Sequence, residues 1–108
     1  MSPDRAAPRP AATVVVARGQ ENWELLLLKR HHKSGFMANA YVFPGGRVDP
    51  GDASEAIIGL IQGIELDDLL RRMDGVTSRI EAASYVIAVV RETFEEAGIL
   101  LARDNAGA

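Results

Sequence analysis

Residues 91–99 read RETFEEAGI and close a run of apolar residues at helical spacing. The spacing predicts a helix from about Glu81 to Ala97. Gly98 follows at the position where helices commonly end in the left-handed conformation, so we expect it to terminate this helix. The glutamates of this stretch therefore lie near the carboxyl end of a long helix, where they oppose the helix dipole.

Glu92, Glu95 and Glu96 share one arc of this helix at about 100° per residue, and Arg91 flanks them. Neighbouring carboxylates repel one another. A hard divalent cation would reverse that cost, because Mg²⁺ and Mn²⁺ prefer oxygen ligands. The alternative interpretation is an acidic helix face in contact with solvent. The opposite arc is apolar and is the predicted packing face, formed by Ala83, Ile87, Val90 and Phe94.

A second motif lies upstream, at residues 43–46, which read FPGG and follow a short aromatic strand. Proline and glycine interrupt regular structure, so a loop is predicted here, and the glycines could serve only as turn residues. Asp52 is followed three residues later by Glu55, the spacing of a capping box. A helix is therefore expected to begin near Ala53 and to carry Ile61.

The remaining segments predict a small α/β domain. Residues 12–17 and 23–29 are rich in valine and leucine, are separated by turn residues, and predict a β-hairpin. Residues 66–73 predict a short helix. Residues 1–11 are rich in proline, alanine and arginine and predict a flexible N-terminal lead.

Composition excludes several classes of function. The 108 residues allow one domain, and 47% hydrophobic with 25% charged residues is ordinary for a globular protein. A net charge of −3 argues against a nucleic-acid polymer as partner. The lack of cysteine excludes disulfides, thiolate zinc sites and thiol nucleophiles. No apolar run approaches the roughly 20 residues that cross a bilayer. No targeting segment is visible, so the cytoplasm is the expected location and no membrane is an expected partner.

Together the two motifs resemble the Nudix box, G-x5-E-x7-R-E-U-x-E-E-x-G-U, in which U is a bulky aliphatic residue. Gly46 and Asp52 match its first half, with aspartate in place of glutamate. Residues 91–99 match its second half, with Thr93 where an aliphatic residue is usual. Residues 53–90, 38 in number, replace the usual seven. This insertion is similar to that of the subgroup that includes the peroxisomal coenzyme A diphosphatase-like Nudix proteins.

The resemblance implies an α/β fold, the Nudix-type αβα sandwich around a mixed sheet. Residues 12–108 would form the N-terminal part of this domain, with residues 53–83 as a helical insertion within the Nudix box. Nudix domains continue after this helix with further strands and a second helix. We therefore expect the chain to be truncated, lacking its C-terminal strands and helix.

The resemblance also implies a metal-dependent hydrolase that cleaves the diphosphate bond of a nucleoside diphosphate linked to another moiety. Coenzyme A or an acyl-coenzyme A is a candidate for this nucleotide-type substrate. By position, Mg²⁺ or Mn²⁺ would be held by the carboxylates of Glu92, Glu95 and Glu96 and by the Gly45 carbonyl. Arg91 would orient the glutamates and belong with them to the catalytic group.

Other positions carry weaker expectations. Arg30, Arg47 and Gly46 could bind the substrate's phosphates, and the alternative for the two arginines is solvated loop charge. Asp52 and Gly98 are assigned structural roles, Asp52 as a helix N-cap or as the first acid of the box. A second function also stays open, a non-catalytic truncated domain that acts as a binding or assembly module. Exposed sheet edges and apolar surface would then favour a homodimer.

Overall fold

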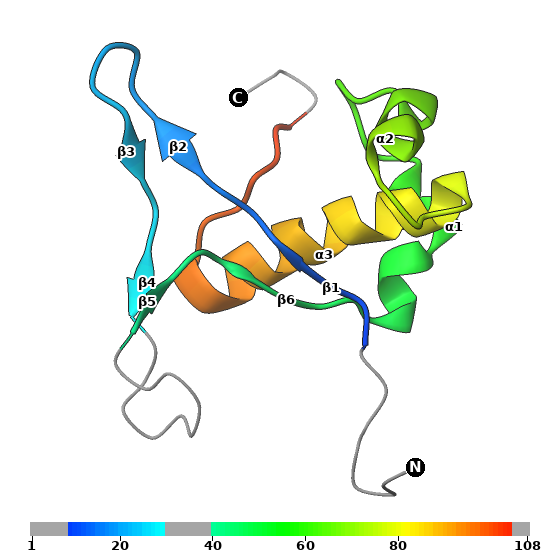
Figure 1. The fold of residues 1–108 in the computed structure, drawn as a ribbon, viewed down its shortest axis with the longest axis horizontal. Coiled ribbons are helices and arrows are strands. Elements are labelled where there is room, and N and C mark those ends of the chain that lie inside the picture. Colours follow the sequence, from blue (N-terminus) through cyan, green and yellow to red (C-terminus); the bar gives the residue numbers. More distant parts are fainter. Residues whose placement is uncertain (1–8, 30–39, 105–108) are drawn as a thin grey trace, which may run out of the picture.

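The computed structural model describes residues 9–29 and 40–104 of the chain (Figure 1). The described part contains short strands, a 3₁₀ helix and three α-helices. Its elements are β1 (Ala11–Thr13), β2 (Ala17–Arg18), β3 (Glu24–Leu25), β4 (Leu28–Lys29), β5 (Tyr41–Val42), β6 (Gly45–Arg47), η1 (Pro50–Ala53), α1 (Glu55–Ile58), α2 (Leu66–Arg72) and α3 (Arg79–Ala97).

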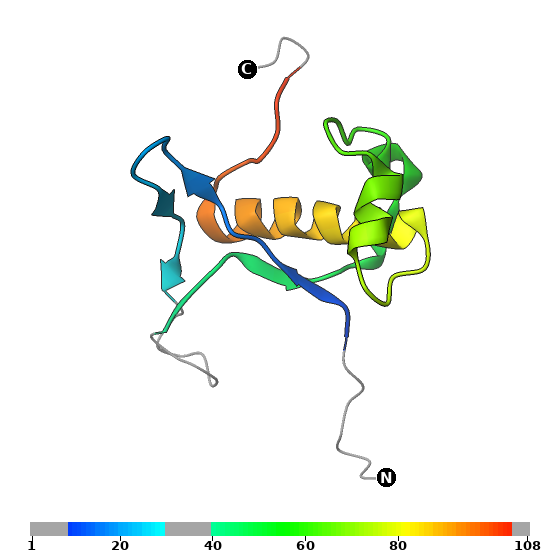
Figure 2. The same ribbon diagram turned by 45° about the horizontal axis from the view of Figure 1, so that its top comes forward.

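Helix α3 is the element on which the others pack. Figures 1 and 2 show β1 and β6 crossing it, and η1, α1 and α2 lie against it as well. Ser78 caps its start, because the hydroxyl accepts the backbone N–H of Glu81 at 3.0 Å. Gly98 ends it with φ 70°, and its N–H donates to the Phe94 carbonyl at 2.9 Å. The predicted helix and its glycine terminator are thus confirmed, with a start two residues earlier.

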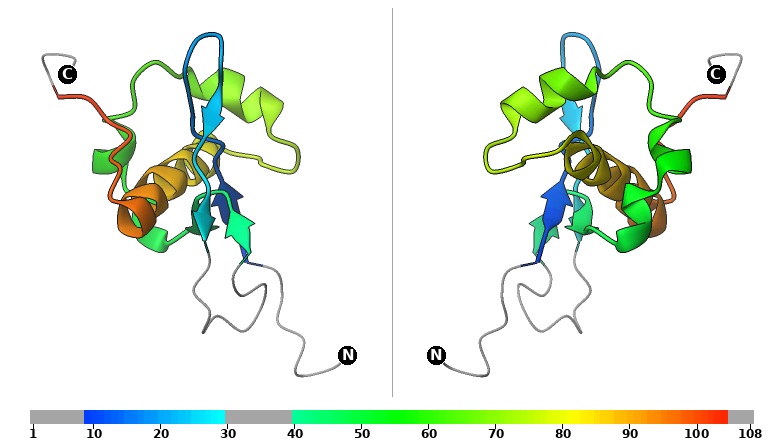
Figure 3. Two further views of the ribbon diagram at one scale, coloured as in Figure 1. Left: turned by 90° about the vertical axis from the view of Figure 1, so that its left-hand side faces the viewer. Right: turned by 90° about the vertical axis from the view of Figure 1, so that its right-hand side faces the viewer.

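The strands pair antiparallel as β1–β6, β2–β3 and β4–β5 (Figure 3). The predicted hairpin is present as β2–β3. Each of its long predicted strands is divided into two short ones. Where the chain leaves β1, the N–H of Val14 donates a hydrogen bond to the Pro44 carbonyl at 2.9 Å. The parallel pairing that a mixed sheet requires does not occur among these described strands. Strand β1 begins at Ala11, inside the predicted N-terminal lead, and residues 1–8 of that lead lie outside the described residues.

The prediction of a loop at the two glycines is wrong, because Gly45 and Gly46 begin strand β6. The reason is the missing side chain. A Cβ on Gly45 would lie 2.2 Å from the Ala12 carbonyl oxygen, so only glycine lets β6 approach β1 this closely. Pro44 lacks an N–H, but its carbonyl still accepts the hydrogen bond from Val14. Backbone contact with β1 therefore decides the conformation here.

The predicted N-cap at Asp52 is also wrong. Asp52 lies within the 3₁₀ helix η1, and α1 starts only after Ser54. The Asp52 carboxylate accepts a hydrogen bond from the N–H of Asp49 at 2.7 Å and forms an ion pair with Arg91 of α3, so it faces the interior. Helix α1 ends before Gly59, a poor helix former, and does not reach Ile61. The predicted short helix is confirmed as α2.

The buried core is small and lies along α3. The buried hydrophobic residues are Ala82, Ala83 and Ala88, whose size allows close packing. Thr93 is fully buried, and its hydroxyl donates to the Val89 carbonyl at 2.6 Å, which satisfies the polar group that replaces an aliphatic residue.

The predicted packing face is wrong at Phe94, which is 52% exposed. The side chains of Ile87 and Val90 are half-buried, and only Ala83 of that face is fully buried. The helix instead turns its small residues to its neighbours, because β1, β6 and η1 approach it closely. Among the described residues, no helix is both long and apolar enough to cross a membrane.

Substitution of Gly45 by alanine tests the close approach of β1 and β6. Gly45→Ala should lower the free energy of unfolding by roughly 1–3 kcal/mol, because the new methyl group meets backbone rather than a movable side chain. Gly51→Ala is the matched control, since nothing lies within 4 Å of its Cβ position. Urea denaturation measures both. Equal stability of the two variants would contradict the assignment.

Candidate active site

Arg91, on α3, is the centre of a network of charges. Its guanidinium forms a two-pronged ion pair with Asp52, from Nε to Oδ1 at 3.0 Å and from Nη2 to Oδ2 at 3.1 Å. Nη2 also donates to the Arg47 carbonyl at 2.9 Å. Nη1 donates to Glu92 at 3.0 Å and to Glu95 at 3.2 Å. One planar side chain thus joins η1, β6 and two of the predicted metal ligands.

Asp52 is the buried partner of this network, with its side chain only 3% exposed. Burial raises the pKa of its carboxyl. The hydrogen bonds from Arg91 and from the Asp49 backbone together lower this pKa by more than burial raises it, so the pKa lies below its ordinary value. The hydrogen bond to Asp52 is in turn the main cause that raises the pKa of Arg91. Asp49 adds a looser contact to Arg91 at 3.4 Å. The pair is therefore fully charged at neutral pH.

The two glycines of β6 contact the other side of the glutamate cluster. A Cβ on Gly46 would lie 2.5 Å from the carboxyl carbon of Glu92, so the absence of a side chain makes room for this carboxylate. The N–H of Gly45 donates to Glu96 Oε1 at 3.0 Å. Glu92 and Glu96 are thus held against the same strand, while Glu95, 54% exposed, is turned to solvent and Arg91.

The Gly45 carbonyl lies on the edge of β6 that faces these carboxylates. The Pro44 carbonyl accepts the N–H of Val14, the residue after β1, and the N–H of Val48 donates to the carbonyl of Pro10, the residue before β1. Bonded positions alternate along an antiparallel ladder, so Gly45 occupies a non-bonded position. The N–H and C=O of such a residue point to the same edge, and the Gly45 N–H already reaches Glu96. Strand geometry therefore places the carbonyl on the same edge of β6 as this N–H, the edge away from β1.

The oxygen donors at this place suit a hard divalent cation. Carboxylates of Glu92 and Glu96 meet at β6, beside the edge that carries the Gly45 carbonyl. Across residues 9–29 and 40–104, however, no three acidic or histidine side chains already lie together as a metal-binding group. The chemistry of the donors fits Mg²⁺ or Mn²⁺, and Arg91 holds Glu92 and Glu95 in place.

Of the three predicted phosphate-binding residues, the structure describes Gly46 and Arg47, both in β6. Arg30 lies outside the described residues. The Cβ direction of Gly46 faces Glu92, and neighbouring side chains of a strand point to opposite faces, so the side chain of Arg47 lies on the far face. Arg47 contributes its carbonyl instead, to Arg91. Gly46 makes room for a carboxylate.

A cavity of about 640 Å³ is lined by one of the glutamates, Glu96, and by a residue that sequence reasoning missed. Lys29, from β4, lines it together with Glu96. The remaining lining residues are Ala11, Ala12, Thr13, Leu28, Val42, Phe43, Gly45 and Gly46. The available signal was the position of Lys29, a charged residue that ends a run of four leucines.

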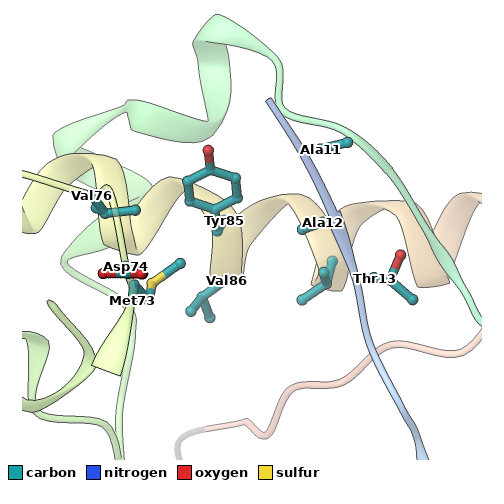
Figure 4. A pocket seen from close by; sticks show the side chains of 9 residues that line it. Ala11, Ala12, Thr13, Met73, Asp74, Val76, Tyr85 and Val86 are labelled. Atoms are coloured by element: carbon teal, nitrogen blue, oxygen red, sulfur yellow. The ribbon is translucent and has the colours of Figure 1, made fainter. Parts of the chain in front are cut away.

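A second hollow of about 470 Å³ lies between β1, α3 and the loop after α2 (Figure 4). Its lining includes Met73, Val76 and Tyr85 and none of the glutamates of residues 91–99. This hollow is therefore lined by one acid, Asp74, and lies apart from the glutamates beside β6.

A family model, proteins of similar sequence and a solved structure all indicate the same family for this chain. The family model of the NUDT19 Nudix domain matches residues 5–76. The acyl-coenzyme A diphosphatase NUDT19 of Xenopus laevis is 38% identical over 97 residues, covering 74% of this chain and 26% of that protein. Its namesake from Gallus gallus is 35% identical over 117 residues, covering 93% of this chain and 29% of that protein.

A solved structure shares the fold. The crystal structure of a NUDIX hydrolase from Alicyclobacillus acidocaldarius superposes with a TM-score of 0.62 at 30% identity, covering 93% of this chain and 41% of that one. The α/β fold that the resemblance implied is thus shown. The chain spans between a quarter and a third of the length of the two curated relatives.

Substitution of Asp52 by asparagine tests the buried ion pair. Asp52→Asn should lower the free energy of unfolding at pH 7 by roughly 3–5 kcal/mol, because Arg91 keeps a charge that has lost its buried partner. Since the folded pKa of Asp52 is depressed, its stabilisation is present above the unfolded value of about 3.9 and is lost as pH falls through the folded pKa. Urea denaturation between pH 7 and pH 2 should therefore show a steeper acid loss in the wild type.

Asp67→Asn is the control for this measurement. Asp67 also pairs with an arginine, Arg79 at 3.2 Å, but both side chains are more than 60% exposed. Such a pair contributes about 0–1 kcal/mol. If the two variants lost the same stability, the buried pair would not have the role assigned to it.

Proposed function

Since this chain belongs to the Nudix hydrolase family, we propose that it carries the metal-binding part of a hydrolase that cleaves a diphosphate bond. The substrate would be a nucleoside diphosphate linked to a second moiety, and the products would be two phosphorylated compounds. The observation that carries the proposal is the arrangement around Arg91. Its guanidinium holds Glu92 and Glu95, while Glu96 is held on the backbone of Gly45.

Coenzyme A or an acyl-coenzyme A is the substrate that we propose within this class. Support comes from the relatives, which carry the name acyl-coenzyme A diphosphatase. The family model also extends through α1 and α2, which lie in the proposed helical insertion of residues 53–83. In this proposal the Nudix domain comprises residues 12–108.

The residues of the chain divide the work of the reaction. A bound Mg²⁺ or Mn²⁺ would neutralise charge on the diphosphate and make the attacking water more acidic. Glu92, Glu95, Glu96 and the Gly45 carbonyl would hold it. Arg91 keeps two of these carboxylates in place and is itself kept in place by Asp52. Of the two glutamates that Arg91 holds, Glu95 is the more accessible and could take the proton of the water.

A second candidate is the non-catalytic binding or assembly module. The observation that favours it is the number of large apolar side chains exposed on the described part of the chain, among them Trp23, Tyr41, Leu60 and Phe94. A homodimer would cover such surface. Catalysis that depends on the glutamates would decide for the hydrolase. The cytoplasmic location stays a prediction from the sequence.

Substitution of Glu95 by glutamine tests the proposed hydrolase. Glu95→Gln should reduce the rate of coenzyme A cleavage by several orders of magnitude, because it removes a charged ligand or base while keeping the shape of the side chain. Its circular dichroism should match that of the wild type, since the lost ion pair is exposed. Glu55→Gln, an exposed glutamate on α1, is the control and should retain activity. Equal rates for all three proteins would refute the assignment of Glu95.

Thermal unfolding with and without Mn²⁺ tests the metal site without any substrate. A cation that binds only the folded state should stabilise it by about 2.7 kcal/mol at a hundredfold excess over its Kd, which raises Tm by several degrees. The shift, followed by helical circular dichroism, should disappear in Glu92→Gln and persist in Glu55→Gln. A Tm that Mn²⁺ leaves unchanged in the wild type would contradict the proposed ligands.

A further inference from the structure

We infer that Lys29, which lines the same cavity as Glu96, binds the diphosphate of the substrate; this inference rests on the proposed function. Lys29 belongs to β4 and lies at the same cavity as Glu96, Gly45 and Gly46. It is the only cationic side chain among the described residues that line this cavity. The charged residues of its described lining are therefore one acid, Glu96 on α3, and one cation, Lys29 on β4.

A second cation is needed because Arg91 is not free to serve the substrate. Its Nε, Nη1 and Nη2 atoms all donate to partners within the chain, namely Asp52, Glu92, Glu95 and the Arg47 carbonyl. A diphosphate that enters beside three glutamates carries charge of the same sign as theirs. A metal ion offsets part of that repulsion, and a lysine in the same cavity offsets more of it.

The fold places Lys29 at a suitable distance from the glutamates. In the β4–β5 pair, Lys29 lies opposite Tyr41, and the chain continues from Tyr41 through Phe43 into Gly45. These four steps of chain span at most about 13 Å, at about 3.3 Å per residue. Lys29 is exposed and its four-carbon stem is flexible, so its ammonium can approach a phosphoryl group bound in the cavity that it lines with Glu96.

The other described arginines do not compete for this role. The Arg47 side chain lies on the face of β6 away from Glu92, as the direction of the Gly46 Cβ shows. Arg18 pairs with Glu24 on the β2–β3 hairpin at 3.1 Å and is absent from the cavity lining. Among the described residues, Lys29 thus combines positive charge with a place in the lining of this cavity.

Steady-state kinetics on two substrates tests the inference. Lys29→Met should raise KM for coenzyme A about tenfold to a hundredfold, the size expected for a lost charge-assisted hydrogen bond, while kcat stays within about twofold. The same rise should occur with dephospho-coenzyme A, which has the diphosphate but lacks the 3′-phosphate. Lys29→Arg should restore most of the affinity, and Arg18→Met, a matched removal of one exposed cation, should change neither constant.

Two outcomes would overturn the inference. One is an unchanged KM for both substrates in Lys29→Met. The other is a KM that rises for coenzyme A alone, which would assign Lys29 to the 3′-phosphate.

A binding measurement separates failure of the inference from failure of the proposed function. If the wild-type chain cleaved neither substrate, the proposed function would fail. Calorimetric titration with inorganic diphosphate would then decide on Lys29 alone. Binding that is about tenfold weaker in Lys29→Met than in Arg18→Met would support the inference, and equal binding in the two variants would overturn it.

Discussion

The ion pair between Arg91 and Asp52 is the interaction on which the described structure depends. Its partners come from α3 and from η1, on either side of the two short helices α1 and α2. Because the Asp52 side chain is almost fully buried, removal of the Arg91 charge would leave the Asp52 carboxylate without an ion-pair partner in the interior. The same guanidinium holds Glu92, Glu95 and the Arg47 carbonyl, so the fold and the candidate site share one anchor.

The contact between β6 and α3 is built from backbone and carboxylate rather than from side-chain packing. Gly46 leaves room for Glu92, and the N–H of Gly45 holds Glu96. A side chain at either position would push the strand away, from the helix in one case and from β1 in the other. The small alanines of α3 serve the same end, because they let neighbouring elements come close. Close approach at this place is what gives the cavity an acidic wall.

Much of this arrangement was predictable from residue types and spacing. The periodicity of residues 81–97 and the glycine after them predict most of α3 and its end, since a helix face and a left-handed terminator are local properties. The common arc of Glu92, Glu95 and Glu96 follows from the same periodicity. The resemblance to the Nudix box then linked these residues to the glycines upstream. The family match and the solved structure agree with the Nudix family and the α/β fold that this resemblance implied.

Long-range contacts decided the rest. Asp52 has the spacing of an N-cap, yet it faces inward because Arg91, 39 residues later, reaches it. Gly45 reads as a turn residue but forms a strand, since its missing Cβ allows pairing with β1. Phe94 falls on the apolar arc but is exposed, because the neighbours of α3 lie elsewhere. Lys29 reaches the cavity only through the pairing of β4 with β5. Local sequence determines which residues share a helix face; the packing of distant segments determines what that face meets.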